Sequence, residues 1–118
     1  MWRSLALGRD GAFLKAELKT LDCILALKAL GEENRLRILR LLLADELSVN
    51  AISEQLHITH YNASKHLRIL REAGLVASTK HAQQRLYTLA GDFRSHLAES
   101  SNILDLGCCQ FDFDRLPH

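Results

Sequence analysis

The sequence predicts a mainly helical α+β fold, with about five helices and one two-stranded β-hairpin in a chain of 118 residues. Two observations lead to this prediction. Apolar residues recur at helical spacing through most of the chain, and the period changes to two only between residues 75 and 89. The length suits one domain. We expect that domain at residues 12–106, after an N-terminal extension (1–11) and before a tail (107–118).

Composition narrows the class of protein. Hydrophobic residues make up 47% of the chain and charged residues 25%, as is usual for a soluble globular domain. No apolar run approaches the ~20 residues of a membrane span, and the first residues lack the features of a secretory signal. We therefore expect a cytoplasmic protein with no membrane partner. Three cysteines, an odd number, do not form a disulfide framework, so we expect reduced thiols.

The first helix is predicted at residues 12–30, before Gly31, and it has two apolar stripes. A surface helix of a small domain needs only one apolar face. The second stripe favours contact with another subunit, and the alternative is a helix buried centrally in one subunit. One stripe contains Leu14, Leu18, Leu21 and Leu25, and the other contains Ala12, Ala16, Cys23, Leu27 and Leu30.

A second helix is predicted at residues 33–44, where Glu32 and Glu33 suit the positive end of the helix dipole. Two more helices joined by a tight turn follow between residues 48 and 75. Their apolar positions recur at helical spacing, Thr59 is placed to cap the second of them, and Gly74 is placed to end it. These positions are Val49, Ile52 and Leu56 in the first, and Ala63, Leu67 and Leu70 in the second.

The side of the second of these helices that faces away from the core carries donors and cations. Such side chains reach base edges and phosphates from a helix in the major groove of DNA. The alternative is an amphipathic helix whose polar face is only solvated. The predicted contact residues at this helix are Thr59, His60, Tyr61, Asn62, Ser64, Lys65 and Arg68.

The next segment favours nucleic-acid contact. Residues 75–80 and 85–89 are predicted to form a β-hairpin, with a turn at 81–84 that is longer than a two-residue Asn-Gly turn. A basic hairpin directly after such a helix is typical of a winged helix-turn-helix, whose wing lies along phosphates or the minor groove. The predicted contacts are Lys80, His81, Gln83, Gln84 and Arg85.

Charge supports the same interpretation, although the whole chain carries only +1. Residues 57–94 contain six Lys or Arg against two Asp or Glu, whereas residues 99–118 contain four acidic residues against one Arg. A last helix is predicted at residues 92–106 from Phe93, Leu97, Ser101 and Leu104, and it would end at Gly107. An extended tail with Phe111 and Phe113 on one side would follow.

Three segments resemble the ArsR/SmtB family of bacterial metal- and thiol-responsive repressors: ALGEENRLRILRLL, ITHYNASKHLRILREAGLV, and the hairpin that ends in RLYTL. The resemblance covers roughly residues 21–106. It implies a homodimer formed largely by the first and last helices. It also implies binding to a palindromic operator, which is released when an inducer binds.

Two sensing sites of the family have no complete counterpart in this chain. Where some members have two cysteines separated by one residue, the chain reads Glu46-Leu47-Ser48-Val49-Asn50. Other members bind zinc between their last helices through paired acidic and histidine ligands. Here His96 and Glu99 supply only half of such a site, because Asp92-Phe93-Arg94 stands where the partner motif would be, and we interpret both as solvated helix residues. The wing turn also lacks the glycine that many relatives have.

Cys108 and Cys109 are the remaining candidates for an inducer site. Adjacent Cα atoms lie about 3.8 Å apart, closer than in ordinary disulfides, whereas two neighbouring thiolates can converge on one soft ion. The resemblance implies trivalent arsenic or antimony, with Cys23 as a third ligand if the first and last helices meet; Cys23 fits a small core residue equally well. The alternative is a thiol-redox or persulfide-responsive repressor that uses Cys23 with Cys108 or Cys109. No constitutive cofactor is expected, and zinc lacks a recognised ligand spacing.

Two other classes of function fit the sequence less well. An enzyme would need a nucleophile with a base, or an open metal site, and the chain has neither a C-x-x-C motif nor a cofactor loop. A winged helix that binds only proteins would not need the basic wing and helix. The sequence therefore favours a DNA-binding repressor.

Overall fold

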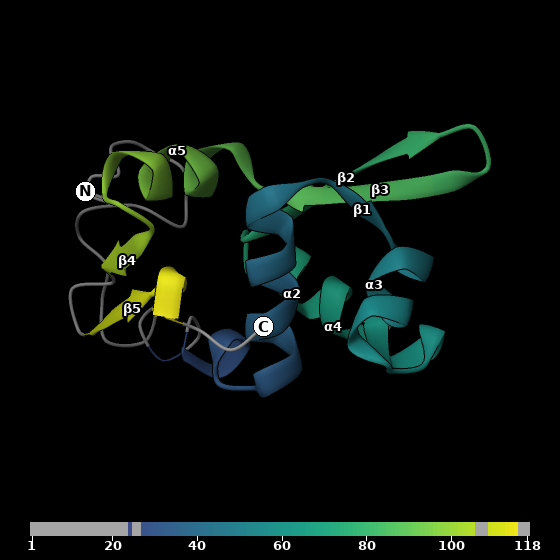
Figure 1. The fold of residues 1–118 in the computed structure, drawn as a ribbon, viewed down its shortest axis with the longest axis horizontal. Coiled ribbons are helices and arrows are strands. Elements are labelled where there is room, and N and C mark those ends of the chain that lie inside the picture. Colours follow the sequence, from purple (N-terminus) through teal and green to yellow (C-terminus); the bar gives the residue numbers. More distant parts are fainter. Residues whose placement is uncertain (1–23, 25–26, 106–108, 116–118) are drawn as a thin grey trace.

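The computed structural model describes residue 24 and residues 27–105 and 109–115 of the chain. Helix α2 (Glu33–Ala44) lies at the centre of the molecule (Figure 1). It begins after Glu32, whose backbone is extended and whose carboxylate caps the helix by accepting the Arg35 N–H at 3.0 Å. Its inner face buries Ile38, Leu39 and Leu42. The helix predicted at residues 33–44 is confirmed.

The helix-turn-helix consists of α3 (Val49–Leu56) and α4 (His60–Glu72). His57 ends α3 in the left-handed region, and the turn places Thr59 before α4, where its hydroxyl accepts the Asn62 N–H at 3.0 Å. Gly74 follows α4 with φ of 84°, a conformation that costs glycine little. Both the predicted cap and the predicted stop are therefore confirmed.

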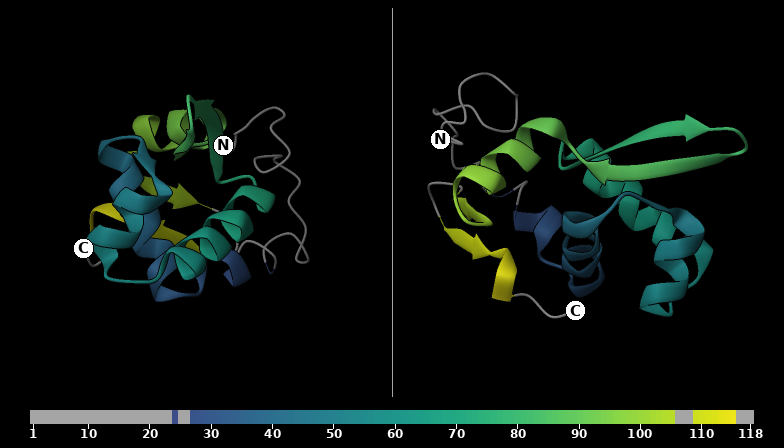
Figure 2. Two further views of the ribbon diagram at one scale, coloured as in Figure 1. Left: turned by 90° about the vertical axis from the view of Figure 1, so that its right-hand side faces the viewer. Right: turned by 45° about the horizontal axis from the view of Figure 1, so that its top comes forward.

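The wing belongs to a three-stranded antiparallel sheet. Strand β3 (Gln84–Leu89) lies between β1 (Leu47–Ser48) and β2 (Val76–His81), and the β2–β3 hairpin extends beyond the helices at one end of the molecule (Figures 1 and 2). Because β1 leads directly into α3, the sheet holds the wing and the helix-turn-helix together.

The hairpin turn differs from its prediction. His81 pairs with Gln84, which leaves a loop of two residues, and the expected longer turn is wrong. The pairing of β2 with β3 continues as far as this two-residue loop, and the chain can turn there because Ala82 adopts φ of 54°. This left-handed conformation usually favours glycine or asparagine.

The last helix is also shorter than predicted. α5 (Gly91–Glu99) ends where Ser101 and Asn102 adopt φ of 57° and 63°, and the Asn102 N–H donates to the Leu97 carbonyl at 2.8 Å. The expectation of a helix to residue 106 is wrong, because residues 103–105 are extended and pair with a later strand.

The chain after α5 folds back on the domain. β4 (Ile103–Asp105) and β5 (Gln110–Asp112) form an antiparallel pair, and the 3₁₀ turn η2 (Phe113–Arg115) follows. The segment expected as an extended tail is extended at β5, but it then buries Phe113 completely. The Phe113 and Phe93 rings meet edge to face, with centroids 5.7 Å apart.

Only the end of the predicted first helix lies within the described residues. Ile24 and residues 27–30 are helical; Ala29 and Leu30 are buried, whereas the side chains of Ile24 and Leu27 are 44% and 38% exposed. A side chain at Gly31 would place its Cβ 2.8 Å from the Leu27 carbonyl oxygen, so the chain requires glycine there. Most of the two predicted stripes lies outside the described residues.

Candidate nucleic-acid interface

One side of α4 is buried in the core and the opposite side is exposed to solvent, as predicted. Ala63, Leu67 and Leu70 are fully buried against the domain. Every predicted contact residue at this helix is exposed, with Tyr61 the most prominent at 73%. These exposed residues are Thr59, His60, Tyr61, Asn62, Ser64, Lys65 and Arg68. They therefore form a continuous polar and basic surface on the N-terminal two-thirds of the helix, which we call the α4 face.

Thr59 serves the fold and remains available to a ligand. Its Oγ1 accepts the Asn62 N–H, which fixes the first turn of α4. A hydroxyl can accept and donate at once. The same side chain can therefore cap the helix and donate its proton to a phosphate oxygen.

The wing is anchored at its base and exposed at its tip. Tyr87 and Leu89 on β3 are buried, and Tyr87 faces Leu47 of β1 across the sheet. Toward the turn, Lys80, His81, Gln83, Gln84 and Arg85 are all exposed. The Arg85 guanidinium also donates to the Ser78 hydroxyl at 3.0 Å. This bond across the hairpin orients the Arg85 side chain.

One cation of the basic segment, Arg94, is exposed but bonds to other elements of the domain. The Arg94 Nη2 donates to the Thr88 hydroxyl at 2.9 Å and lies 3.4 Å from the Leu42 carbonyl oxygen. It thereby joins α5 to β3 and to the end of α2. We therefore leave Arg94 out of the interface, although it adds to the charge of the segment.

Behind α4 lies a polar cluster that sequence reasoning missed. The Arg35 Nη1 lies 3.3 Å from His66 Nδ1, and His66 Nε2 lies 3.8 Å from Glu32 Oε1. Burial lowers the pKa of His66; Glu32 opposes this effect, whereas Arg35 and Lys65 add to it. Residues 35 and 66 are far apart in sequence, and no spacing pattern connects them.

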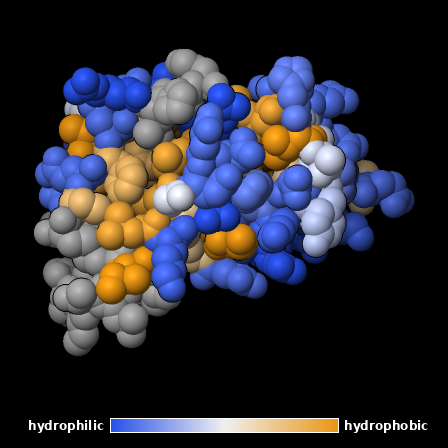
Figure 3. All heavy atoms as spheres, turned by 90° about the horizontal axis from the view of Figure 1, so that it is seen from below, coloured by the Kyte–Doolittle hydropathy of each residue, from blue (hydrophilic) through white to orange (hydrophobic). Residues whose placement is uncertain are grey.

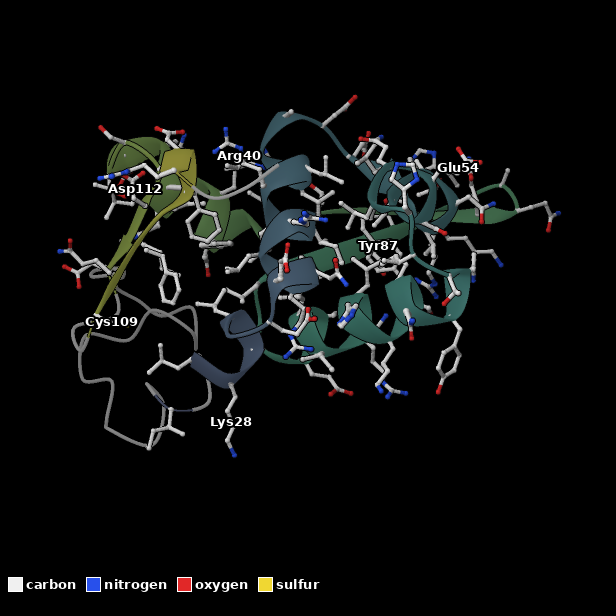
Figure 4. The ribbon with its side chains drawn as sticks, turned by 60° about the horizontal axis from the view of Figure 1, so that its bottom comes forward. Lys28, Arg40, Glu54, Tyr87, Cys109 and Asp112 are labelled. Atoms are coloured by element: carbon white, nitrogen blue, oxygen red, sulfur yellow. The ribbon has the colours of Figure 1, made fainter. Side chains whose placement is uncertain are left out.

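The cysteines are described only in part. Cys23 and Cys108 lie outside the described residues. Cys109 directly precedes β5, at the end of the molecule away from α3 and α4 (Figure 4). It is half-buried and packs on the hydrophobic core. Burial raises the pKa of the Cys109 thiol, and the nearby Asp105 carboxylate raises this pKa further.

The positions of the other candidate metal ligands, His96 and Glu99, do not indicate a metal site. Among residues 24, 27–105 and 109–115, no three His, Cys, Asp or Glu side chains are grouped so that they could hold a metal ion. Glu99 is exposed as expected, whereas His96 is half-buried. None of the helices in the described part of the chain is long and apolar enough to cross a membrane.

Comparisons with known proteins agree with this geometry. Residues 30–79 match the family model described as a helix-turn-helix domain. The chain is 42% identical over 74 residues to the transcriptional activator HlyU of Vibrio cholerae, covering 63% of this chain and 68% of the relative. It is 33% identical over 84 residues to the biofilm growth-associated repressor of Agrobacterium fabrum, covering 71% and 72%.

A solved structure extends the similarity to three dimensions. The homodimeric winged helix-turn-helix DNA-binding domain of a possible ArsR-family transcriptional regulator from Mycobacterium bovis superimposes with a TM-score of 0.61. It is 28% identical, and the match covers 74% of this chain and 87% of that one.

Proposed function

Because this chain belongs to the ArsR-like winged helix-turn-helix transcriptional regulators, we propose that it is a homodimeric repressor that releases its operator when As(III) or Sb(III) binds its cysteines. One observation carries the DNA-binding part. The exposed α4 face and the exposed wing tip are held in fixed relation by the β1–β3 pairing. Two such units related by a two-fold axis would read a palindromic operator in successive major grooves.

Lys65 and Arg68 are the cations that α4 offers to DNA. Both are exposed, and they lie three residues apart on the same side of the helix. In the proposed complex they contact phosphates or base edges, while Tyr61 and Asn62 lie at the N-terminal end of the helix where it enters the groove. The tip of the wing, with Lys80 and Arg85, follows the adjacent backbone.

A second copy of the chain is the proposed partner of the first helix. Ile24 and Leu27 are two of the three large hydrophobic residues that are exposed within the described part of the chain. In the face seen in Figure 3, hydrophobic residues are concentrated toward one end and the centre of the molecule, and hydrophilic residues predominate toward the other end. An exposed apolar surface on a small domain is typical of a protein interface. The dimer would cover it.

The chemistry of Cys109 is compatible with arsenic binding. Arsenous acid, As(OH)₃, exchanges one hydroxide for each thiol: an As–S bond forms, an As–O bond breaks, and the thiol proton leaves in a water molecule. Ligation by neutral thiols therefore needs no net loss of protons. The thiolate is the reactive form both in ligation of a soft ion and in oxidation by peroxide, and the raised pKa of Cys109 lowers the thiolate fraction at neutral pH.

Fluorescence anisotropy tests both parts of the proposal. Reduced protein is titrated onto a labelled duplex that has been selected from random-sequence DNA, and arsenite is then added. Removing one phosphate contact should lower the slope of log affinity against log salt by about one. We therefore expect Lys65→Ala and Arg68→Ala to weaken binding and reduce this slope. Lys28→Ala, which removes an exposed lysine outside the α4 face, should change neither.

The inducer is tested with the same duplex. Arsenite should release the wild-type protein but not Cys108→Ser/Cys109→Ser, and Cys23→Ser then shows whether the third thiol is needed. Release by peroxide or a persulfide donor, with no response to arsenite, would replace this proposal with a thiol-redox repressor. If the selection enriches no sequence, the DNA-binding part of the proposal is wrong.

A further inference from the structure

The Arg35 side chain joins two elements across the back of the helix-turn-helix. It extends from the first turn of α2 and makes three contacts through different nitrogen atoms. Nε donates to the Ala29 carbonyl at 2.6 Å, and Nη2 donates to the Lys28 carbonyl at 3.0 Å. Nη1 lies 3.3 Å from His66 Nδ1 on α4. One guanidinium therefore connects the helical segment at 27–30 with the helix that carries the α4 face.

The chemistry of arginine determines the protonation state that this contact requires. A guanidinium carries only donors, so His66 Nδ1 must accept. An imidazole with an accepting Nδ1 is neutral and carries its proton on Nε2, which faces the Glu32 carboxylate at 3.8 Å. The His66 side chain is only 14% exposed, so water does not readily replace Arg35 as its partner.

We propose that Arg35 and His66 are positioning residues, which hold α4 in its DNA-reading orientation relative to the segment at 27–30 while the His66 ring is neutral. This inference rests on the proposed role of α4. Neither side chain belongs to the α4 face, because Arg35 lies on α2 and the half-buried His66 side chain contacts it. Their effect on DNA binding is therefore exerted through the angle of α4, which sets where Lys65 and Arg68 meet the duplex.

Protonation of His66 would break this contact. A proton on Nδ1 would set an N–H against the Arg35 N–H, so two donors and two positive charges would face each other. Three charged groups face the ring: Glu32 before α2, Arg35 within α2, and Lys65 on α4 itself. Glu32 is the one attractive partner, but its Oε1 already caps α2 at the Arg35 N–H. A charged His66 would compete with that cap and release α4 from its orientation.

Arg35→Met tests positioning, because it keeps an unbranched apolar stem and removes every donor of the guanidinium. We expect it to weaken binding to the selected duplex by about tenfold and to leave the salt slope unchanged, since Arg35 bonds within the protein. Arg37→Met is the matched control: Arg37 lies on the same helix and pairs with Glu33 at 3.0 Å. It should bind as the wild type does. Circular dichroism verifies that each variant folds.

His66→Gln tests the requirement for a neutral ring. Glutamine can accept from Arg35 through its side-chain oxygen and does not titrate. We expect wild-type affinity at pH 7.5, and between pH 7.5 and 5.5 a smaller loss of affinity than the wild type shows. His57, His60 and His81, the exposed histidines of the helix-turn-helix and wing, are present in both proteins. The difference between the two pH profiles therefore isolates His66.

The possible failures are distinguishable. If Arg35→Met lowers the salt slope by about one, Arg35 contacts a phosphate and the inference is wrong. Superimposable pH profiles for the wild type and His66→Gln would also overturn it, even if Arg35→Met does not fold. Failure of the wild-type protein to select any duplex would refute the proposed function instead.

Discussion

Replacing Phe113 by alanine should remove a large part of the stability of the domain. Phe113 is fully buried although it lies only five residues from the C-terminus, and its ring packs edge to face on Phe93. Truncating a buried phenylalanine to alanine costs ~3–5 kcal/mol in general. Of this, the loss of an aromatic pair accounts for ~0.5–1.5 kcal/mol. We expect Phe113→Ala to lower the free energy of unfolding by about 3–4 kcal/mol.

Urea denaturation at a fixed protein concentration measures this change, because the concentration affects the apparent stability of a dimer. Phe111→Ala is the matched control. Phe111 lies two residues earlier on β5 and is only half-buried, so its truncation should cost roughly 1 kcal/mol. If Phe113→Ala remained within ~0.5 kcal/mol of the wild type, as a surface substitution does, the segment after β4 would not pack on the domain and the inferred core would be wrong.

Three further predictions concern single elements. Thr59→Ala removes the cap of α4 and should cost ~1 kcal/mol in urea denaturation, whereas Thr59→Ser should cost little. Ala82→Gly should raise the free energy of unfolding by up to ~1 kcal/mol, because φ of 54° strains alanine; no gain would mean that the turn adopts another conformation. Burial holds the pKa of His66 below its ordinary value of 6.5, so on acidification the unfolded chain is protonated first. Stability should then fall as the pH drops below about 6.5, and His66→Gln should reduce the loss.

Elements whose signals lie within a few residues could be predicted from the sequence. The sequence predicts helix α2 at residues 33–44, because acidic residues precede a regular apolar repeat, and the structure agrees. The cap at Thr59 and the stop at Gly74 followed from residue types that favour one local conformation. The exposed face of α4 followed from the same repeat. These features depend on the backbone nearby and not on distant partners.

Features that depend on distant partners could not be predicted in this way. The repeat from Phe93 to Leu104 has helical spacing, but pairing of residues 103–105 with 110–112 overrides it. Likewise, continuous pairing of β2 with β3 draws Ala82 into a conformation that its residue type does not favour. The contact between Arg35 and His66 spans 31 positions, so only the fold shows that the recognition surface has a support behind it.

The position of α2 links the proposed inducer site to the proposed DNA-reading helix. At one side Arg40 donates to the Phe113 carbonyl, which joins α2 to the segment that carries Cys109. At the other side Arg35 reaches His66 of α4. A helix of 12 residues is internally hydrogen-bonded, so it shifts as a unit more easily than it bends. Ligation that displaces β5 and η2 would therefore move α2, and α2 would carry Arg35 away from His66. In this arrangement the helix-turn-helix can change its orientation while its own fold stays intact.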